Sequence, residues 1–503
     1  MAEEVEGTGA TIGGFVEGPF GAPVPESQES TELKHDELNL FDATAVAVSS
    51  VAPAYSLATA LGSMFIISAV GFKAPGMVIL SFIPILFIAY AYFHLNRRNP
   101  NCGASYSWLA QVFHPGMGWF NGFIQAGIST IFCIQSPIVA STYTLSFFAS
   151  IGWISQSTTN SRGLLMILGL FWLAIITIFC IVGIRWTTNF QWILCIIEYL
   201  VVVGMSIGGI IKVAVDPSAR HAHFSAAWLN PLGVHSLGAM ATALAIGTFL
   251  FWGWDTAVNL NEESKNASRT PGRAAIISMW LILAVFLLNF IAAEILLPTS
   301  SFSASNVLFV FGEAFAGKWA GYLMIFAVLS SSVATTQTTL LPAARITYAM
   351  SRDGVFPKAF GRIHPKFRTP AVGTAILGCI AAAGIVIVQY TSAGQNIIAT
   401  FTNNVGALVA FYYGITGVAC GWAFRKAWKE KTGFTITGII LPTISGIVLI
   451  AIMIWDIKSN GWSGMKWDII LLIIAAVLTP IVAFRKRDTS FFKAKTISYD
   501  TIE

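Results

Sequence analysis

Residues 40–69 read LFDATAVAVSSVAPAYSLATALGSMFIISA, and the fold is organised around this stretch. It is long and apolar enough to cross a bilayer as a helix, yet Ser49, Ser50 and Pro53 stand where the hydrocarbon would be deepest. Proline removes a backbone donor and clashes with the preceding turn, and neighbouring serines can bond to the groups that are freed. Because unpaired backbone is not tolerated against lipid, we expect this interruption to face protein or a water-filled cavity.

A second apolar stretch, residues 236–261, is interrupted near Gly253, where the chain reads FLFWGWDT. Glycine allows backbone conformations that other residues avoid. A pair of interrupted spans is the best sequence indication of a binding site in a secondary transporter. The alternative for each span is a kinked helix without a ligand, because proline and glycine are tolerated in membrane helices.

The composition is that of a protein that crosses the membrane many times. Of 503 residues, 55% are hydrophobic and 11% are charged, whereas soluble domains average about 25% charged residues. The six cysteines show no CxxC or metal-ligand spacing, and the chain has no P-loop, HExxH or GxSxG sequence. We therefore expect neither an enzyme nor an ATP-driven pump, and no organic cofactor, resident metal or nucleic-acid partner.

Apolar stretches of membrane length recur twelve times, and the dense groups of Lys and Arg all follow even-numbered stretches. Basic residues mark the cytoplasmic side, so the pattern predicts an all-α protein of the cell membrane with both termini in the cytoplasm. The interrupted spans are five apart and run in opposite directions, as an inverted repeat requires. The predicted segments are a disordered cytoplasmic tail (1–38), two five-helix repeats (39–212 and 236–424), two extra helices (434–484) and a second cytoplasmic tail (485–503).

The unwound backbone at the two breaks indicates how a ligand would bind. The N-terminus of a half-helix bonds a carboxylate, and free carbonyls accept from an ammonium. This pattern fits a zwitterionic amino acid, with aromatic residues closing over it. Gln125 and Ser129, four residues apart on one helical stripe, can line the same cavity or bond across helices. The candidate substrate-binding residues are Ser49, Ser50, Ala52, Pro53, Ala54, Phe251, Trp252, Gly253, Trp254, Gln125 and Ser129.

Two acids inside the apolar stretches are candidates for proton coupling, because ionisable groups at this depth are costly and usually functional. Glu198 has apolar neighbours on both sides, and burial of a carboxylate favours its neutral form. A hydrogen-bonded structural glutamate is the alternative. Asp255, two residues past the second break, could take a proton, bind an amine or cap the half-helix that follows, since aspartate is a preferred N-cap.

Three hydroxyl residues lie close together on a predicted helix, with Ser331 and Ser332 about one turn before Thr335. With the carbonyls of a broken span they could form an oxygen site for Na⁺. In the alternative, each hydroxyl bonds to a carbonyl of its own helix four residues earlier. Protons are therefore the favoured coupling ion, and Na⁺ is the second choice.

Three segments resemble the amino acid–polyamine–organocation permeases. They are residues 101–122, residues 252–274 (WGWDTAVNLNEESKNASRTPGRA) and residues 343–373, which contain RITYAMSRDG. The resemblance implies a LeuT-type fold and secondary transport of amino acids or amines by alternating access. It also implies that the first break holds the substrate carboxylate, that the second break meets the amine, and that the region of Thr335 sits against the first break.

The chain departs from the family pattern in two places. The first break is usually Gly-rich, but here residues 49–56 read SSVAPAYS. Glu198 stands where proton-coupled members often carry a lysine. The sequence favours import of an amino acid with protons. The alternatives are an amine or polyamine permease in which Asp255 pairs with the cation, an amino acid exchanger, and a sensor that does not transport.

Overall fold

The computed structural model describes residues 15–17, 23–25, 32–304 and 306–501, with the backbone alone described at 15–17, 23–25, 396–404 and 463. Most of the predicted disordered tail, 1–38, therefore lies outside the described residues. The described part is almost entirely helical, and its only strands are β1 (Phe15–Glu17) and β2 (Pro23–Pro25), which pair antiparallel.

The α-helices are α1 (Leu40–Val51), α2 (Pro53–Phe65), α3 (Ala74–Arg98), α4 (Ser105–Val112), α5 (Pro115–Ser150), α6 (Arg162–Val182), α7 (Ile184–Val215), α8 (Leu237–Leu250), α9 (Thr256–Asn259), α10 (Thr270–Leu296), α11 (Val307–Ala316), α12 (Lys318–Arg352), α13 (Ala371–Tyr390), α14 (Ser392–Ala423), α15 (Thr432–Phe434), α16 (Leu441–Arg485) and α17 (Ser490–Lys493). Short 3-10 turns and one π-helical turn connect several of them.

The described residues contain 11 helical segments that are long and apolar enough to cross a membrane. The sixth predicted span, 236–261, is not among them, because its first half is the 14-residue helix α8 and its second half is the four-residue helix α9. Helix α16 bends at Gly461, whose φ is 62°, and this bend separates the two extra helices expected over 434–484.

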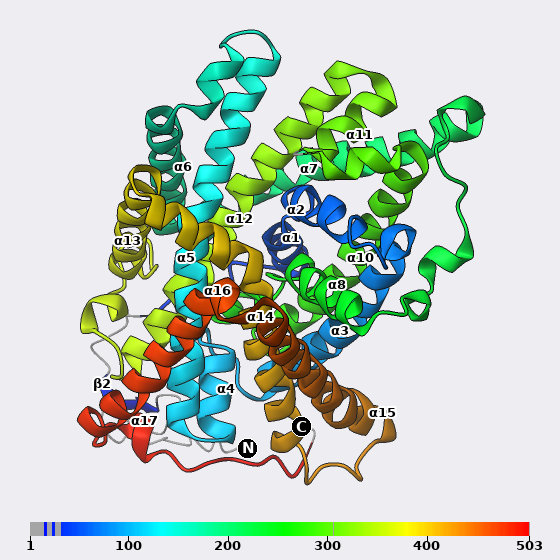
Figure 1. Ribbon diagram of the computed structural model, residues 1–503. Coiled ribbons are helices and arrows are strands. Elements are labelled where there is room, and N and C mark those ends of the chain that lie inside the picture. The colour runs from blue at the N-terminus through cyan, green and yellow to red at the C-terminus, as the bar shows by residue number, and fades with distance from the viewer. Residues whose placement is uncertain (1–14, 18–22, 26–31, 305, 502–503) are drawn as a thin grey trace, which may run out of the picture.

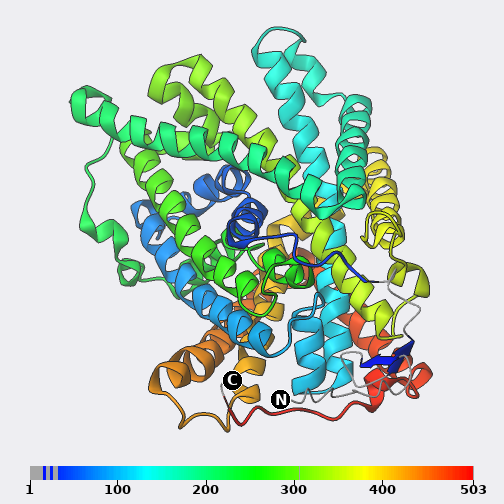
Figure 2. The ribbon, with the colours of Figure 1, turned by 180° about the vertical axis from the view of Figure 1, so that it is seen from behind.

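The broken segments lie in the middle of the bundle. Figures 1 and 2 show α1 and α2, in dark blue, surrounded by longer helices. Helix α1 packs against α7, α10 and α12, while α8 packs against α3 and α14. The window of membrane length over α1 and α2 is 89% buried, against 22% for α6, so the interrupted backbone is shielded from lipid by protein.

Both ends of the described chain pack on the same face of the bundle. Leu33 and Phe491 belong to one buried cluster with Tyr106, and the ring of Phe491 stacks on that of Tyr106 at 5.4 Å. The backbone N–H groups of Glu37 and Leu38 donate to the carbonyl of Glu263. The 11 candidate spans, with the interrupted α8–α9 pair as a twelfth, agree with ends that lie on one face.

Candidate functional site

The first break is a single residue wide. Ala52 separates α1 from α2 and has a left-handed backbone (φ 51°, ψ 67°), which costs about 1–2 kcal/mol in a residue with a Cβ. Pro53 follows at the first position of α2, where its fixed φ suits a helix start and its missing N–H is no loss. The predicted interruption at Ser49 to Ala54 is thus confirmed.

The N-terminus of α2 is capped by side chains from other helices. The backbone N–H of Ala54 donates to Glu198 Oε1 at 2.6 Å, and that of Tyr55 donates to Ser331 Oγ at 3.1 Å. The Ser331 hydroxyl itself donates to Glu198 Oε1 at 2.8 Å. Glu198, fully buried on α7, therefore ties the start of α2 to α12.

The second break lies directly against the first. Gly253 has φ 118°, and a Cβ built on it would lie 2.7 Å from the Ser50 carbonyl oxygen. Only glycine fits this backbone conformation at this distance. The hydroxyls of Ser50 and Thr256 are 2.8 Å apart, and Thr335 Oγ1 donates to the Ser50 carbonyl at 3.3 Å.

A cavity opens where the two breaks meet α5, α12 and α14. Seven of the predicted site residues line it: Ser50, Gln125, Ser129, Trp252, Gly253, Asp255 and Thr335. The residues that the sequence analysis did not identify are Ile128, Thr256, Asn259, Thr338, Thr339, Pro342, Ile346 and Tyr412. Thr338 and Thr339 continue the hydroxyl-rich run of α12, so extending that helical stripe would have found them. Tyr412 had no such local signal.

Asp255 is held by two tyrosines from α14. Tyr412 and Tyr413 donate their hydroxyls to its two carboxylate oxygens at 3.2 and 2.9 Å. The prediction that Asp255 caps the next half-helix is wrong, because its side chain makes no capping hydrogen bond to α9. Within the described part of the chain, Asp255 forms no ion pair with a basic side chain.

The three aromatic residues of the second break point in different directions. Trp252 lines the cavity, donates its indole N–H to Tyr412 at 2.7 Å, and meets the ring of Phe132 edge-on at 5.0 Å. Phe251 instead packs away from the cavity, against the rings of Phe82 and Phe286. Trp254 is fully buried and stacks on Tyr413. Of the three, Trp252 alone is placed to cover a ligand.

The remaining predicted site residues do not line the cavity. Ser49 donates to Gln191 on α7 at 2.5 Å, away from the cavity. Ala52, Pro53 and Ala54 are buried and contribute backbone geometry. Ser332 donates to the Val328 carbonyl of its own helix at 2.7 Å. The predicted sodium ligands thus have different partners: Ser331 bonds Glu198, Thr335 bonds Ser50, and Ser332 bonds its own helix.

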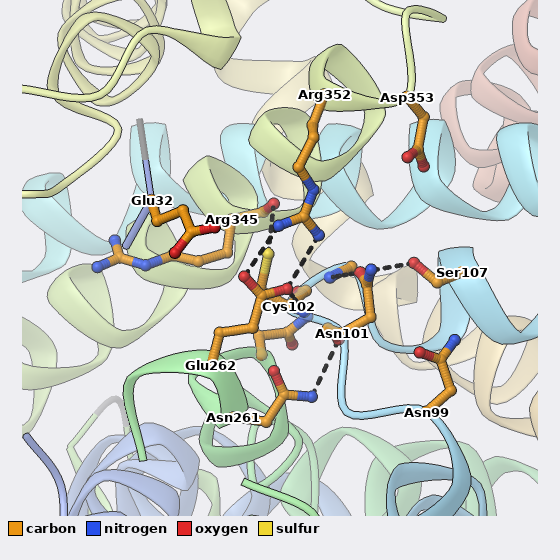
Figure 3. A network of polar contacts seen from close by, with 12 residues as sticks. Glu32, Asn99, Asn101, Cys102, Ser107, Asn261, Glu262, Arg345, Arg352 and Asp353 are labelled. Atoms are coloured by element: carbon orange, nitrogen blue, oxygen red, sulfur yellow. Dashed lines mark hydrogen bonds and ion pairs between the residues drawn. The ribbon is translucent and has the colours of Figure 1, made fainter. Parts of the chain in front are cut away.

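A polar network lies at the last turns of α12, and Figure 3 shows Arg352 bonded to Glu262 within it. Arg352 forms two bonds of 2.9 Å with Glu262, and the fully buried Arg345 forms bonds of 3.1 and 3.0 Å with Glu263. Burial opposes ionisation of Glu262, but the Arg352 guanidinium outweighs it and lowers the pKa of that carboxyl below its usual value.

This network is joined to the cavity by the cavity-lining Asn259, whose side-chain amide donates to the Cys102 carbonyl at 3.0 Å. Glu262 in turn accepts from the Cys102 backbone N–H at 2.9 Å. The segments at 101–122, 252–274 and 343–373, which carried the family resemblance, therefore meet in one place.

The family model described as "Amino acid permease" matches residues 38–479. The chain belongs to the amino acid permease family. The permease is thus a multi-pass secondary transporter of the amino acid–polyamine–organocation superfamily and not an enzyme, as the sequence predicts.

Relatives of the permease are named for different substrates. It is 26% identical over 417 residues to the low-affinity putrescine importer PlaP of Escherichia coli, covering 80% of this chain and 86% of the relative. It is 23% identical to the human large neutral amino acids transporter small subunit 2, covering 76% of this chain and 68% of the relative. Identity is also 23% to the branched-chain amino acid permease BcaP of Lactococcus lactis, over 80% of this chain and 87% of the relative.

Proposed function

We propose that the permease imports a small molecule that carries a protonated amine, and that this ammonium binds in the cavity between the two breaks. Asp255 carries the proposal. It lines the cavity, it is 7% exposed, and it has tyrosine hydroxyls but no basic partner among the described residues. A buried carboxylate without a cation is unfavourable, and a substrate ammonium would supply the missing charge.

This proposal covers both substrate classes that the sequence raises. PlaP is named for putrescine, and the human and Lactococcus relatives are named for amino acids. An amine and an α-amino acid both present an ammonium to Asp255. Trp252, backed by Phe132, would then cover the bound molecule.

Proton coupling through Glu198 is part of the proposal. Glu198 bonds to the first turn of α2 and to Ser331 of α12, so a change in its charge acts directly on the first break. Na⁺ is the less favoured coupling ion, because Ser331 and Ser332 already have protein partners. We further propose a LeuT-type inverted repeat over 39–212 and 236–424, location in the cell membrane, and cytoplasmic termini.

The test is uptake into proteoliposomes by the Asp255→Asn variant, with labelled putrescine and labelled leucine as the two probes. We expect uptake of every transported probe to fall about 100-fold or more, because the variant loses a buried charge pair worth about 3–5 kcal/mol. Asp456→Asn is the matched control, because Asp456 is equally buried, bonds Asn460 and does not line the cavity. Wild-type uptake by Asp255→Asn would contradict the proposal.

A further inference from the structure

Resting on that proposed function, the geometry points to a narrower substrate class: we propose that the permease selects amines that lack an α-carboxylate, and that Glu198 is the residue that excludes the carboxylate. The N-terminus of a broken helix is a natural binding site for an anion, because its first N–H groups have no partner within the helix. Whether an amino acid can bind here therefore depends on which donors of α2 are free.

None of the first four residues of α2 has a free backbone donor. Pro53 has no N–H, Ala54 donates to Glu198, and Tyr55 donates to Ser331. The N–H of Ser56 donates to the Ala52 carbonyl at 2.9 Å. The protein's own carboxylate thus occupies the position that a substrate carboxylate would need.

Position and charge also keep a second carboxylate away from α2. Ala52, Ala54 and Tyr55 are buried and do not line the cavity. The other oxygen of Glu198, Oε2, is buried without a hydrogen-bond partner. A substrate carboxylate brought to the start of α2 would find the Ala54 N–H and the Ser331 hydroxyl already bonded to Glu198.

The cavity itself is suited to a cation. Its lining contains one carboxylate, Asp255, and no Lys, Arg or His among the described residues. The arginines in the last turns of α12, Arg345 and Arg352, do not line it and are paired with Glu263 and Glu262. No basic side chain is therefore left to neutralise an α-carboxylate.

The rest of the lining has the chemical character that suits a short alkyl chain with a polar end, although the cavity, at about 30 Å³, must widen to admit one. Ile128, Pro342, Ile346 and Trp252 supply apolar surface. Gln125 is 5% exposed, and its amide nitrogen has no hydrogen-bond partner. This buried donor suits an acceptor atom of the substrate, such as a hydroxyl oxygen. The substrate class is thus an aliphatic amine or diamine.

Matched ligand pairs that differ only in the carboxylate test this inference on the purified full chain. The pairs are putrescine and ornithine, cadaverine and lysine, and isopentylamine and leucine, and the readout is the Kd from calorimetric titration. We expect the amine of at least one pair to bind, and its amino acid to bind at least about tenfold more weakly, which is about 1.4 kcal/mol. An amino acid that binds as tightly as its amine would overturn the inference but leave the proposed function standing. Absence of binding by both members of every pair would overturn the proposed function itself.

A variant tests the role assigned to Glu198. Glu198→Gln keeps an oxygen that can accept from Ala54 and removes the negative charge, so the fold of the break is preserved. We expect the amine preference within a pair to shrink at least about threefold. Glu294→Gln is the control, because Glu294 is a fully buried carboxylate on α10 that does not line the cavity. If Glu198→Gln keeps the full preference for the amine, or if Glu294→Gln loses as much of it, Glu198 is not the residue that excludes the carboxylate.

Discussion

The two helix breaks of the permease differ in how their polar groups are satisfied. At the first break, Glu198 and Ser331 accept hydrogen bonds from the first turn of α2, so the protein itself satisfies these backbone donors. At the second break, Asp255 faces the cavity with two tyrosine hydroxyls and no basic side chain among the described residues. The first break is thus satisfied within the protein, whereas the second presents a carboxylate to the cavity, as the proposed ammonium site requires.

The two intramembrane acids, Glu198 and Asp255, differ in what they contact. Both Glu198 and Asp255 are buried, and from sequence both are proton-coupling candidates. Glu198 bonds backbone and a hydroxyl on two other helices, which suits a residue that links charge to helix geometry. Asp255 lines the cavity, which suits a residue that pairs with the substrate.

The largest effect is expected where the two breaks touch. Gly253→Val should abolish transport, lowering its rate about 100-fold or more, because the side chain is strained at positive φ and overlaps the Ser50 carbonyl. Initial rates in proteoliposomes would measure this. Gly204→Ala, on α7 with no atom within 4 Å of its added Cβ, is the control and should transport normally. Normal transport by Gly253→Val would mean that the breaks need not touch.

The next effect concerns coupling at the first break. Glu198→Gln cannot bind or release a proton, so we expect it to lose accumulation driven by an inward proton gradient while exchange of labelled for unlabelled substrate continues. Both can be measured in the same proteoliposomes by changing only the pH gradient. Accumulation that still follows the gradient would show that Glu198 is no more than a structural cap.

A smaller effect is expected at the tyrosines of the second break. Tyr413→Phe removes one of the two hydroxyl donors to Asp255. A hydrogen bond to a charged group is worth about 1.5–3 kcal/mol, so substrate Kd should rise about tenfold. Tyr143→Phe, a partly buried tyrosine that does not line the cavity, should leave Kd unchanged. Equal behaviour of the two variants would contradict a role for the tyrosine pair in holding Asp255.

The smallest effect is expected at Ser332, which bonds only the Val328 carbonyl of its own helix among the described residues. Ser332→Ala should change the free energy of unfolding by less than about 0.5 kcal/mol and leave uptake unaltered. Replacing external Na⁺ by choline should likewise leave wild-type uptake unaltered. A strong dependence of uptake on Na⁺ would instead support a sodium site at Ser331, Ser332 and Thr335.

Local backbone chemistry made the position of both breaks predictable. Pro53 and Gly253 interrupt a helix for reasons that need no neighbour: one lacks an N–H, and the other tolerates a positive φ. The long apolar helices before and after the breaks were equally predictable, because they follow from the apolar stretches of the sequence. The direction in which each side chain points at a break was not predictable. Phe251 and Trp252 are adjacent, yet one enters the core and the other covers the cavity.

The sequence by itself thus determined a helical membrane permease with two broken spans and two intramembrane acids, because helix length, hydrophobicity and the limits of proline and glycine are local properties. Tertiary structure alone decided what each acid contacts. Glu198 meets the N–H of Ala54, 144 residues away, and Asp255 meets the hydroxyl of Tyr413, 158 residues away. Such contacts depend on how helices rotate and pack against one another, and that packing closed the first break with protein groups and left Asp255 of the second break facing a cavity.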